Sequence, residues 1–261
     1  AVVTVNSTTA LMATFSNDGR TITLSPPSVA AQTAAQSPSA ASAPGALPAS
    51  AQTTAPPAGA APTAYRRYFA VVDASHGGDD HGETLTSTLL EKDVTVSLAR
   101  SLRQELESRG ITTLVLRDSD ANLSLDQRAV FANGDHAAIY IAVHAASAGR
   151  GVRVYTALLP FGEDDRGPFR SWSIAQHAAL PLSRTAAGAV AAELQRRQVP
   201  VRTLEAPLRP LNNVIGAAIA VEVAPQGTDV SQITAPDYQQ LVTSAVATAI
   251  AATRDQLGAA P

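Results

Sequence analysis

Four side chains between residues 76 and 222 could do chemistry together: His76, Glu91, His144 and Glu222. Each lies where the sequence predicts the end of a strand or the start of a helix, and an open α/β sheet gathers its active site at such strand ends. Imidazole and carboxylate groups serve as zinc ligands and as general acids and bases. The sequence contains no cysteine, so any zinc in this chain must be held by histidine and carboxylate.

Glu222 gives the strongest signal of the four, because it interrupts the apolar stretch 219–224. A buried carboxylate without a partner is strongly destabilising, so a metal, a cation or a proton must accompany it. The other three residues each have an ordinary structural explanation. His76 precedes two glycines at a turn, His144 could be a buried histidine bonded to a carbonyl, and an acidic residue such as Glu91 is common at a helix start.

Strands and helices alternate from residue 68 to the end of the sequence. The spacing of apolar residues predicts strands over 68–73, 111–116, 138–143, 151–158 and 219–223, and helices over 91–110, 124–133, 183–197 and 236–257. This alternation predicts one α/β catalytic domain, residues 65–258, with a central, largely parallel twisted sheet flanked by helices.

Two segments of different character precede this domain. Residues 1–24 alternate apolar and polar side chains around Asn17-Asp18-Gly19, which predicts a β-hairpin or the remnant of an N-terminal β domain. Residues 25–64 are rich in Ala, Pro, Ser and Thr, and such a segment buries too little apolar surface to fold. We therefore expect it to be an extended linker.

The net charge of −3 argues against a nucleic-acid partner or a polybasic membrane surface. No apolar run is long enough to span a bilayer. The sequence also starts without a methionine or a charged and apolar leader, as expected of a mature protein whose export signal has been removed.

Several motifs together carry a family resemblance, which covers the chain from about Tyr68 to Leu257. They are VVDASHGGDDHG, LLEKDVTVSLARSLRQELESRG, VLRDSD, SLDQRAVFAN, IAVHA, GRGVRVY and LNNVIGAAIAVEV. In this order and at this spacing the chain resembles the zinc-dependent N-acetylmuramoyl-L-alanine amidases, the AmiC-like (Amidase_3) cell-wall hydrolases.

The resemblance implies a Zn²⁺ site of His76, Glu91 and His144, with Glu222 as the catalytic carboxylate. It implies a peptidoglycan hydrolase that cuts the amide bond between N-acetylmuramic acid and the L-alanine of the stem peptide. We expect a periplasmic or extracellular location in the cell envelope. The expected partner is the muramyl peptide of peptidoglycan, a protein activator is kept open as a second partner, and we expect a monomer.

The chain departs from the family pattern in three loops. The usual DPGHGG is Asp73-Ala74-Ser75-His76-Gly77-Gly78, HAN or HAD is His144-Ala145-Ala146, and E-x-GF-x-SN is Glu222-Val223-Ala224-Pro225-Gln226-Gly227. These changes leave the implied ligands in place and affect loop shape and substrate contacts.

Some further polar residues are candidates for lesser roles. Arg150 could contact carboxylates of the peptide or glycan. We interpret Arg117 and Arg128 as structural ion-pair or capping residues. Solvated polarity explains Asp79, Asp80 and His81 near the first histidine, and His136 and His177 are expected at the surface. The loop over residues 160–180 either folds over the site or is a surface excursion fixed by Trp172.

Two other functions remain open at this point. One is a catalytically silent peptidoglycan-binding module that keeps the site for structure. The other is a zinc peptidase or deacylase on a related scaffold. Zinc content and product analysis separate all three.

Overall fold

The computed structural model describes residues 12–15, 22–25, 68–160 and 171–258. The chain divides into two compact units, Ala1–Ala60 and Ala61–Pro261. In the first unit, β1 (Met12–Phe15) pairs antiparallel with β2 (Ile22–Ser25), as expected of the predicted hairpin. Its turn, and the predicted linker beyond residue 25, lie outside the described residues.

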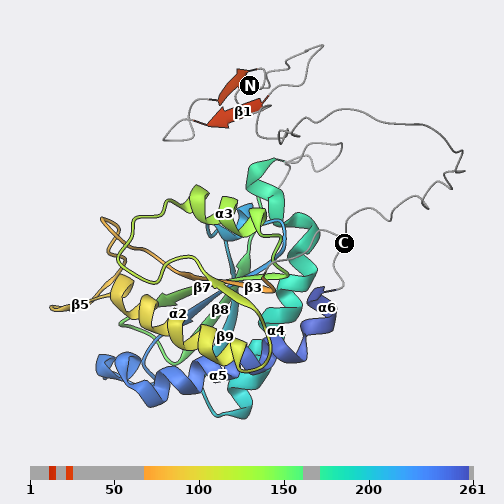
Figure 1. Cartoon of the computed structure of the whole chain (residues 1–261). Helices are drawn as coiled ribbons and strands as arrows, with labels where there is room; N and C mark the ends of the chain where they lie inside the picture. Colours follow the sequence, from red (N-terminus) through yellow and green to blue (C-terminus); the bar gives the residue numbers. More distant parts are fainter. Residues whose placement is uncertain (1–11, 16–21, 26–67, 161–170, 259–261) are drawn as a thin grey trace, which may run out of the picture. The chain divides into compact units, whose positions relative to one another are not determined.

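The second unit is built around a six-stranded sheet in the order β6-β3-β7-β10-β8-β9 (Figure 1). Its strands are β3 (Ala70–Ala74), β6 (Thr113–Val115), β7 (Ile139–Ala145), β8 (Val152–Ala157), β9 (Val201–Ala206) and β10 (Ala217–Val223). All neighbouring strands run parallel except β8 and β10, which pair antiparallel. The prediction of a largely parallel sheet is confirmed.

Helices cover both faces of this sheet, which explains why its central strands are apolar at nearly every position. One face packs against α2 (Glu91–Glu107), α4 (Leu180–Arg196) and α5 (Pro236–Ala252), and Figure 1 shows α2 and α5 side by side there. The opposite face packs against α3 (Leu125–Gly134) and the 3-10 turn η3 (Leu211–Asn213).

Local sequence signals fix where two of these helices begin. Ser124 caps α3 in a capping box with Gln127, as the sequence predicts. α2 starts directly after a small antiparallel hairpin, β4 (Thr84–Thr86) and β5 (Leu89–Leu90), so that Glu91 is its first residue. The buried stripe of Val94, Leu98, Leu102 and Leu106 then holds α2 on the sheet.

The remaining elements differ in detail from the prediction. The predicted helix over 236–257 is two helices, α5 and α6 (Arg254–Gly258). Two short 3-10 segments, η2 (Trp172–Ala179) and η4 (Val230–Thr234), lie in predicted loops. In the part of the chain that the structure describes, no helix is long and apolar enough to cross a membrane.

Candidate functional site

Parallel pairing brings the candidate residues to one edge of the sheet. β7 and β10 run side by side with His144 opposite Glu222, and β3 pairs with β7 so that Ala74 lies opposite Val143. His76 therefore follows β3 at the same edge where His144 and Glu222 lie. Paired residues on adjacent strands project to the same face, so the sheet itself sets His144 and Glu222 next to each other.

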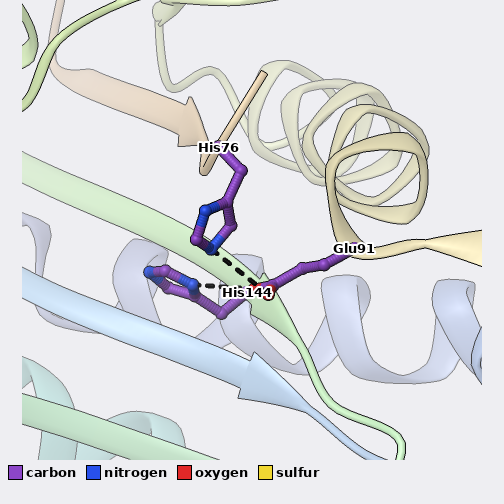
Figure 2. Close-up of side chains that lie close together, drawn as sticks. All are labelled: His76, Glu91 and His144. Atoms are coloured by element: carbon purple, nitrogen blue, oxygen red, sulfur yellow. Dashed lines mark hydrogen bonds and ion pairs between the residues drawn. The ribbon is translucent and has the colours of Figure 1, made fainter. Parts of the chain in front are cut away.

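His76, Glu91 and His144 form a compact cluster at this edge (Figure 2). One nitrogen or oxygen from each residue lies within 4.8 Å of the others. His76 Nε2 is 3.2 Å from Glu91 Oε2, and His144 Nδ1 is 2.9 Å from Glu91 Oε1. The two imidazole rings meet nearly edge to face, with centroids 5.3 Å apart.

Glu91 is buried at the centre of the cluster, where four donors surround its carboxylate. Besides the two histidines, the backbone N–H of Glu83 donates to Oε2 at 2.9 Å and that of Ala145 donates to Oε1 at 3.2 Å. Burial alone would raise the pKa of Glu91, but the hydrogen bonds from His144, His76 and the Glu83 backbone lower it far below its ordinary value. Glu91 is therefore an anion over the whole physiological range.

His76 lies between two carboxylates. Its Nδ1 bonds to the Asp80 carboxylate at 2.9 Å, while Nε2 faces Glu91. Burial lowers the pKa of His76, yet the hydrogen bonds and charges of Glu91 and Asp80 outweigh it and raise that pKa above its ordinary value. The residue adopts a left-handed backbone, φ 65°, which turns the chain sharply at the end of β3.

His144 completes the cluster from β7, and its outer nitrogen also has a partner. Nε2 lies 2.9 Å from Ser75 Oγ, so the hydroxyl and Glu91 bind the two sides of the ring. Ser75 replaces the first Gly of the usual DPGHGG motif, so this contact depends on one of the chain's own departures from that pattern. A hydrogen bond to the outer nitrogen fixes both the tautomer and the orientation of such a ring.

Two buried arginines hold the backbone that carries His76. Arg117 donates to the carbonyls of Ala74 and Ser75 at 3.0 Å, and Arg128 donates to those of Ala74 and His76. Arg128 also forms an ion pair with Asp73. These contacts agree with the interpretation of both arginines as structural residues, because they fix the backbone of residues 74–76 in place.

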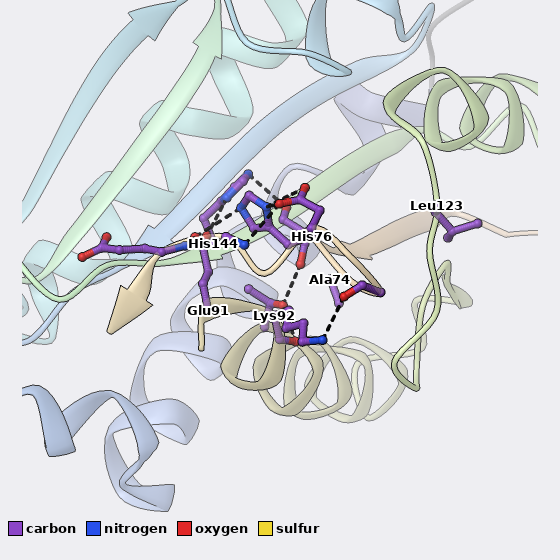
Figure 3. Close-up of polar contacts among 12 residues, drawn as sticks. Ala74, His76, Glu91, Lys92, Leu123 and His144 are labelled. Atoms are coloured by element: carbon purple, nitrogen blue, oxygen red, sulfur yellow. Dashed lines mark hydrogen bonds and ion pairs between the residues drawn. The ribbon is translucent and has the colours of Figure 1, made fainter. Parts of the chain in front are cut away.

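Lys92 and Tyr140 extend this supporting network. Lys92, the only lysine of the chain, donates at 2.9 Å to the carbonyl of Gly78 and to Asp120 (Figure 3). Tyr140 is fully buried and donates its hydroxyl to Asp73. Burial and then the Asp73 charge raise the pKa of Tyr140 well above its ordinary value, so it stays a donor.

Glu222 has a different environment on the neighbouring strands. Tyr155 donates its hydroxyl to Glu222 Oε2 at 2.7 Å, and Arg153 donates to Oε1. Both partners belong to β8, the one strand that pairs antiparallel with β10. The expectation that a cation, metal or proton must accompany this carboxylate is met by the Arg153 guanidinium.

The cluster residues fit a zinc ion. Two histidines and one carboxylate, with a fourth position left open, form a known catalytic zinc arrangement. Gly82 lies directly against them: a Cβ on this residue would come within 2.6 Å of Glu91 Oε2 and 2.7 Å of His76 Cδ2. The chain thus keeps a residue without a side chain where a larger one would displace the cluster.

A family model described as N-acetylmuramoyl-L-alanine amidase, Amidase_3, matches residues 70–252. The chain belongs to this family. The match runs from β3 to the end of α5 and includes all four candidate residues. The resemblance seen in the sequence motifs is confirmed.

Curated relatives match over shorter stretches. The amidase AmiC of Neisseria meningitidis is 31% identical over 94 residues, which are 34% of this chain and 23% of that protein. The germination-specific amidase of Bacillus subtilis is 33% identical over 87 residues, 28% of this chain and 36% of that protein. The matches thus span about a quarter to a third of these amidases.

Solved structures of amidases share the fold of the second unit. The catalytic domain of CwlV from Bacillus (Paenibacillus) polymyxa var. colistinus aligns with a TM-score of 0.57 at 20% identity, over 71% of this chain and 97% of that one. An amidase from Clostridium difficile 630 aligns with a TM-score of 0.56 at 22% identity, over 72% and 97%. The α/β amidase fold is therefore that of this chain.

Three residues of the site were not predicted from the sequence. Asp80 is a direct partner of His76 rather than solvated loop polarity, and Arg153 and Tyr155 are the partners of Glu222. The alternation in residues 152–157 was a usable signal, since it places Arg153 and Tyr155 on one face of a strand. Arg150 lies exposed on the loop before β8, while His136 and His177 are exposed as expected. The predicted loop over the site falls partly on 161–170, outside the described residues.

Proposed function

We propose that this chain is a zinc-dependent peptidoglycan hydrolase that cleaves the amide bond between N-acetylmuramic acid and the L-alanine of the stem peptide. One observation carries the proposal. A cluster of two histidines and a carboxylate lies beside a second, separately held carboxylate, with His144 and Glu222 paired on adjacent strands. Metal-assisted hydrolysis of an amide uses both parts, an electrophilic metal and a base for water.

In this proposal His76, Glu91 and His144 hold the zinc. A bound zinc ion supplies Lewis acidity: it polarises the scissile carbonyl and lowers the pKa of water towards about 7. Glu222 takes the proton of the attacking water as the new C–O bond forms. It then delivers that proton to the amine nitrogen as the C–N bond breaks. Each proton and bond is accounted for without a further reactant.

An exposed arginine on the loop that follows β7 suits a substrate that carries carboxylates. Arg150 is exposed on the loop between β7 and β8 and would bind carboxylates of the peptide or glycan. A wall polymer lies outside the cytoplasm, so a periplasmic or extracellular location follows from the proposed substrate. We also propose that residues 1–24 form a separate β element, that 25–64 tether it, and that the catalytic domain, residues 65–258, acts as a monomer.

A protein partner is a second element of the proposal. The amidase CwlD of Clostridioides difficile, which shares the fold at 18% identity, was solved in complex with the GerS lipoprotein. By analogy, this chain would accept an activating protein on its catalytic domain. Assay of the chain alone and with extracts of its envelope fraction would show whether one is needed.

Product analysis tests the reaction directly. The full chain is incubated with purified peptidoglycan, the soluble products are separated, and their masses are measured by mass spectrometry. We expect stem peptides with a free L-alanine amino group, glycan carrying an intact lactyl group, loss of products with a chelator, and recovery on adding zinc. Cleavage within the stem peptide would instead identify a peptidase. Binding of peptidoglycan without any product, with zinc present, would identify a silent binding module.

A further inference from the structure

The antiparallel pairing of β8 with β10 places two polar side chains beside Glu222. The register sets Arg153 opposite Glu222 and Tyr155 opposite Ala220, two residues earlier on β10. Arg153, Tyr155 and Glu222 therefore project from the same face of the sheet. The remaining strands of the sheet run parallel to their neighbours, so this arrangement exists only at the β8–β10 pair.

Each oxygen of the Glu222 carboxylate has its own donor. Tyr155 Oη donates to Oε2 at 2.7 Å, and Arg153 Nη2 donates to Oε1. The Glu222 side chain is only 18% exposed, so these two bonds take the place of much of its water. A carboxylate bonded at both oxygens cannot rotate without losing one donor.

Arg153 is itself held from the other side. Its Nη2 also donates to the carbonyl of Ala148 at 3.2 Å. Gly149, at φ 131°, brings the backbone so close that an added Cβ would lie 3.5 Å from the Arg153 guanidinium carbon. The guanidinium is thus fixed between the loop after β7 and Glu222, and it is not a freely moving surface charge.

We propose that Arg153 and Tyr155 are positioning residues that hold the Glu222 carboxylate in one orientation beside the metal cluster. The inference rests on the proposed function, in which Glu222 is the general base. A base must be within hydrogen-bond reach of the water it deprotonates, and displacement by about 1 Å can cost about 100-fold in rate. Burial and the bond to Glu222 raise the pKa of Tyr155 to about 12, so its hydroxyl stays a donor at neutral pH.

A purely structural role for the pair makes a different prediction. Residues that only stabilise the sheet would change protein yield or melting temperature and leave the rate constants of the folded enzyme intact. Positioning residues change kcat with little change in KM, because the substrate still binds while the base is misplaced. The conservative variant Arg153→Lys keeps a cation at the strand and should retain part of the rate.

The test uses the full chain, loaded with zinc, acting on a soluble muramyl peptide. We expect Arg153→Met and Tyr155→Phe to lower kcat by about 10- to 100-fold with KM and zinc content unchanged, the range typical of outer partners of reactive groups. Arg202→Met is the matched control. Arg202 pairs with Arg153 across β8 and β9 and is exposed, so its loss removes the same charge one strand away and should leave kcat unchanged.

A double-mutant cycle shows whether the effect passes through Glu222. Adding Arg153→Met to Glu222→Gln should cause no further loss of residual rate, and the losses in melting temperature of the two changes should be less than additive. Unchanged kcat in both Arg153→Met and Tyr155→Phe, while Glu222→Gln has lost most of its rate, would overturn this inference alone. A Glu222→Gln enzyme with the wild-type rate would instead overturn the proposed role of Glu222. If Arg153→Met does not fold, Tyr155→Phe decides, because it removes a single hydroxyl.

Discussion

The site has two halves, each centred on a glutamate, and the two glutamates are held in opposite ways. Glu91, on α2, is surrounded by two imidazoles and two backbone N–H groups. Glu222, on β10, is bound by a guanidinium and a phenol. The side chains that bind Glu91 are imidazoles, a group that can exchange protons near neutral pH, whereas a guanidinium and a phenol ordinarily keep theirs.

This difference fits the roles that we propose, Glu91 as a metal ligand and Glu222 as a general base. In the proposed function, a divalent metal would replace the protons shared between Glu91 and the histidines, which already lie close together. Around Glu222, the donors are permanent, so the carboxylate keeps its place and is available for proton transfer. The sheet register then sets the second half one strand away from the first.

The strongest test of this comparison removes one charge from each half. Glu91→Gln and Glu222→Gln are matched changes of one atom, and we expect both to lower kcat by about 10²- to 10⁴-fold. Only Glu91→Gln should lose zinc, because an amide is a poor replacement for a buried anionic ligand. Metal analysis after dialysis, together with turnover of a muramyl peptide, measures both effects.

Two results would break the comparison. If Glu222→Gln also lost its zinc, Glu222 would belong to the metal cluster. If Glu91→Gln kept zinc at full occupancy, the cluster would have another ligand.

The sequence predicted much of the second half from physical chemistry alone. A carboxylate within the apolar strand 219–224 demanded a partner, and the structure supplies Arg153. Which partner it would be depended on pairing of β8 with β10, and strand order across a sheet is a long-range property that local periodicity does not encode. Strand β9 was not predicted for a different reason: its exposed and charged residues lack the apolar pattern of a buried strand.

The first half was predicted only as a set of separate positions. Glu91 is an ordinary helix-start acid until the fold brings it to His144, 53 residues later in the chain. Asp80 was assigned to the solvated loop because its contact with His76 depends on a left-handed residue and a tight turn. Such backbone geometry is set by neighbouring contacts from Arg117 and Arg128, which no local sequence pattern reveals.

Arg128 offers a test of how far the supporting network serves one half. It is buried, 2% exposed, and pairs with Asp73, itself 1% exposed. Arg128→Met leaves that buried carboxylate without its cation and with only the Tyr140 hydroxyl as a side-chain partner, and we expect a loss of about 3–5 kcal/mol in the free energy of unfolding, measured with urea. The exposed Arg184, paired with Glu205, is the control, and Arg184→Met should change stability by less than about 1 kcal/mol.

The effect on the two halves should also differ in that variant. Arg128 bonds to the carbonyls of Ala74 and His76 but has no described contact with Glu222. Folded Arg128→Met should therefore bind zinc more weakly. Equal stability of Arg128→Met and Arg184→Met would show that the buried pair is not an essential support.

Asp80 tests the metal half without touching a ligand. Its carboxylate binds the outer nitrogen of His76 and fixes the ring so that Nε2 faces Glu91. Asp80→Asn should weaken zinc binding by about 10- to 100-fold, as loss of such outer partners typically does. The neighbouring Asp79 is exposed, and Asp79→Asn should leave affinity unchanged. Competition with a chromogenic chelator measures both, and equal affinities would remove Asp80 from the site.

The smallest expected effect is the pH dependence of zinc affinity, which reports on the same half. Although burial opposes it, Glu91 and Asp80 raise the pKa of His76 above its ordinary value, so zinc must displace a proton from this ring. Affinity should therefore fall by about tenfold for each pH unit below that raised pKa, and level off above it. Because Asp80 contributes to the shift, Asp80→Asn should move the levelling point to lower pH while Glu222→Gln should not. If Glu222→Gln shifted the pH at which zinc affinity levels off, Glu222 would be coupled to His76, and the two halves of the site would not be independent.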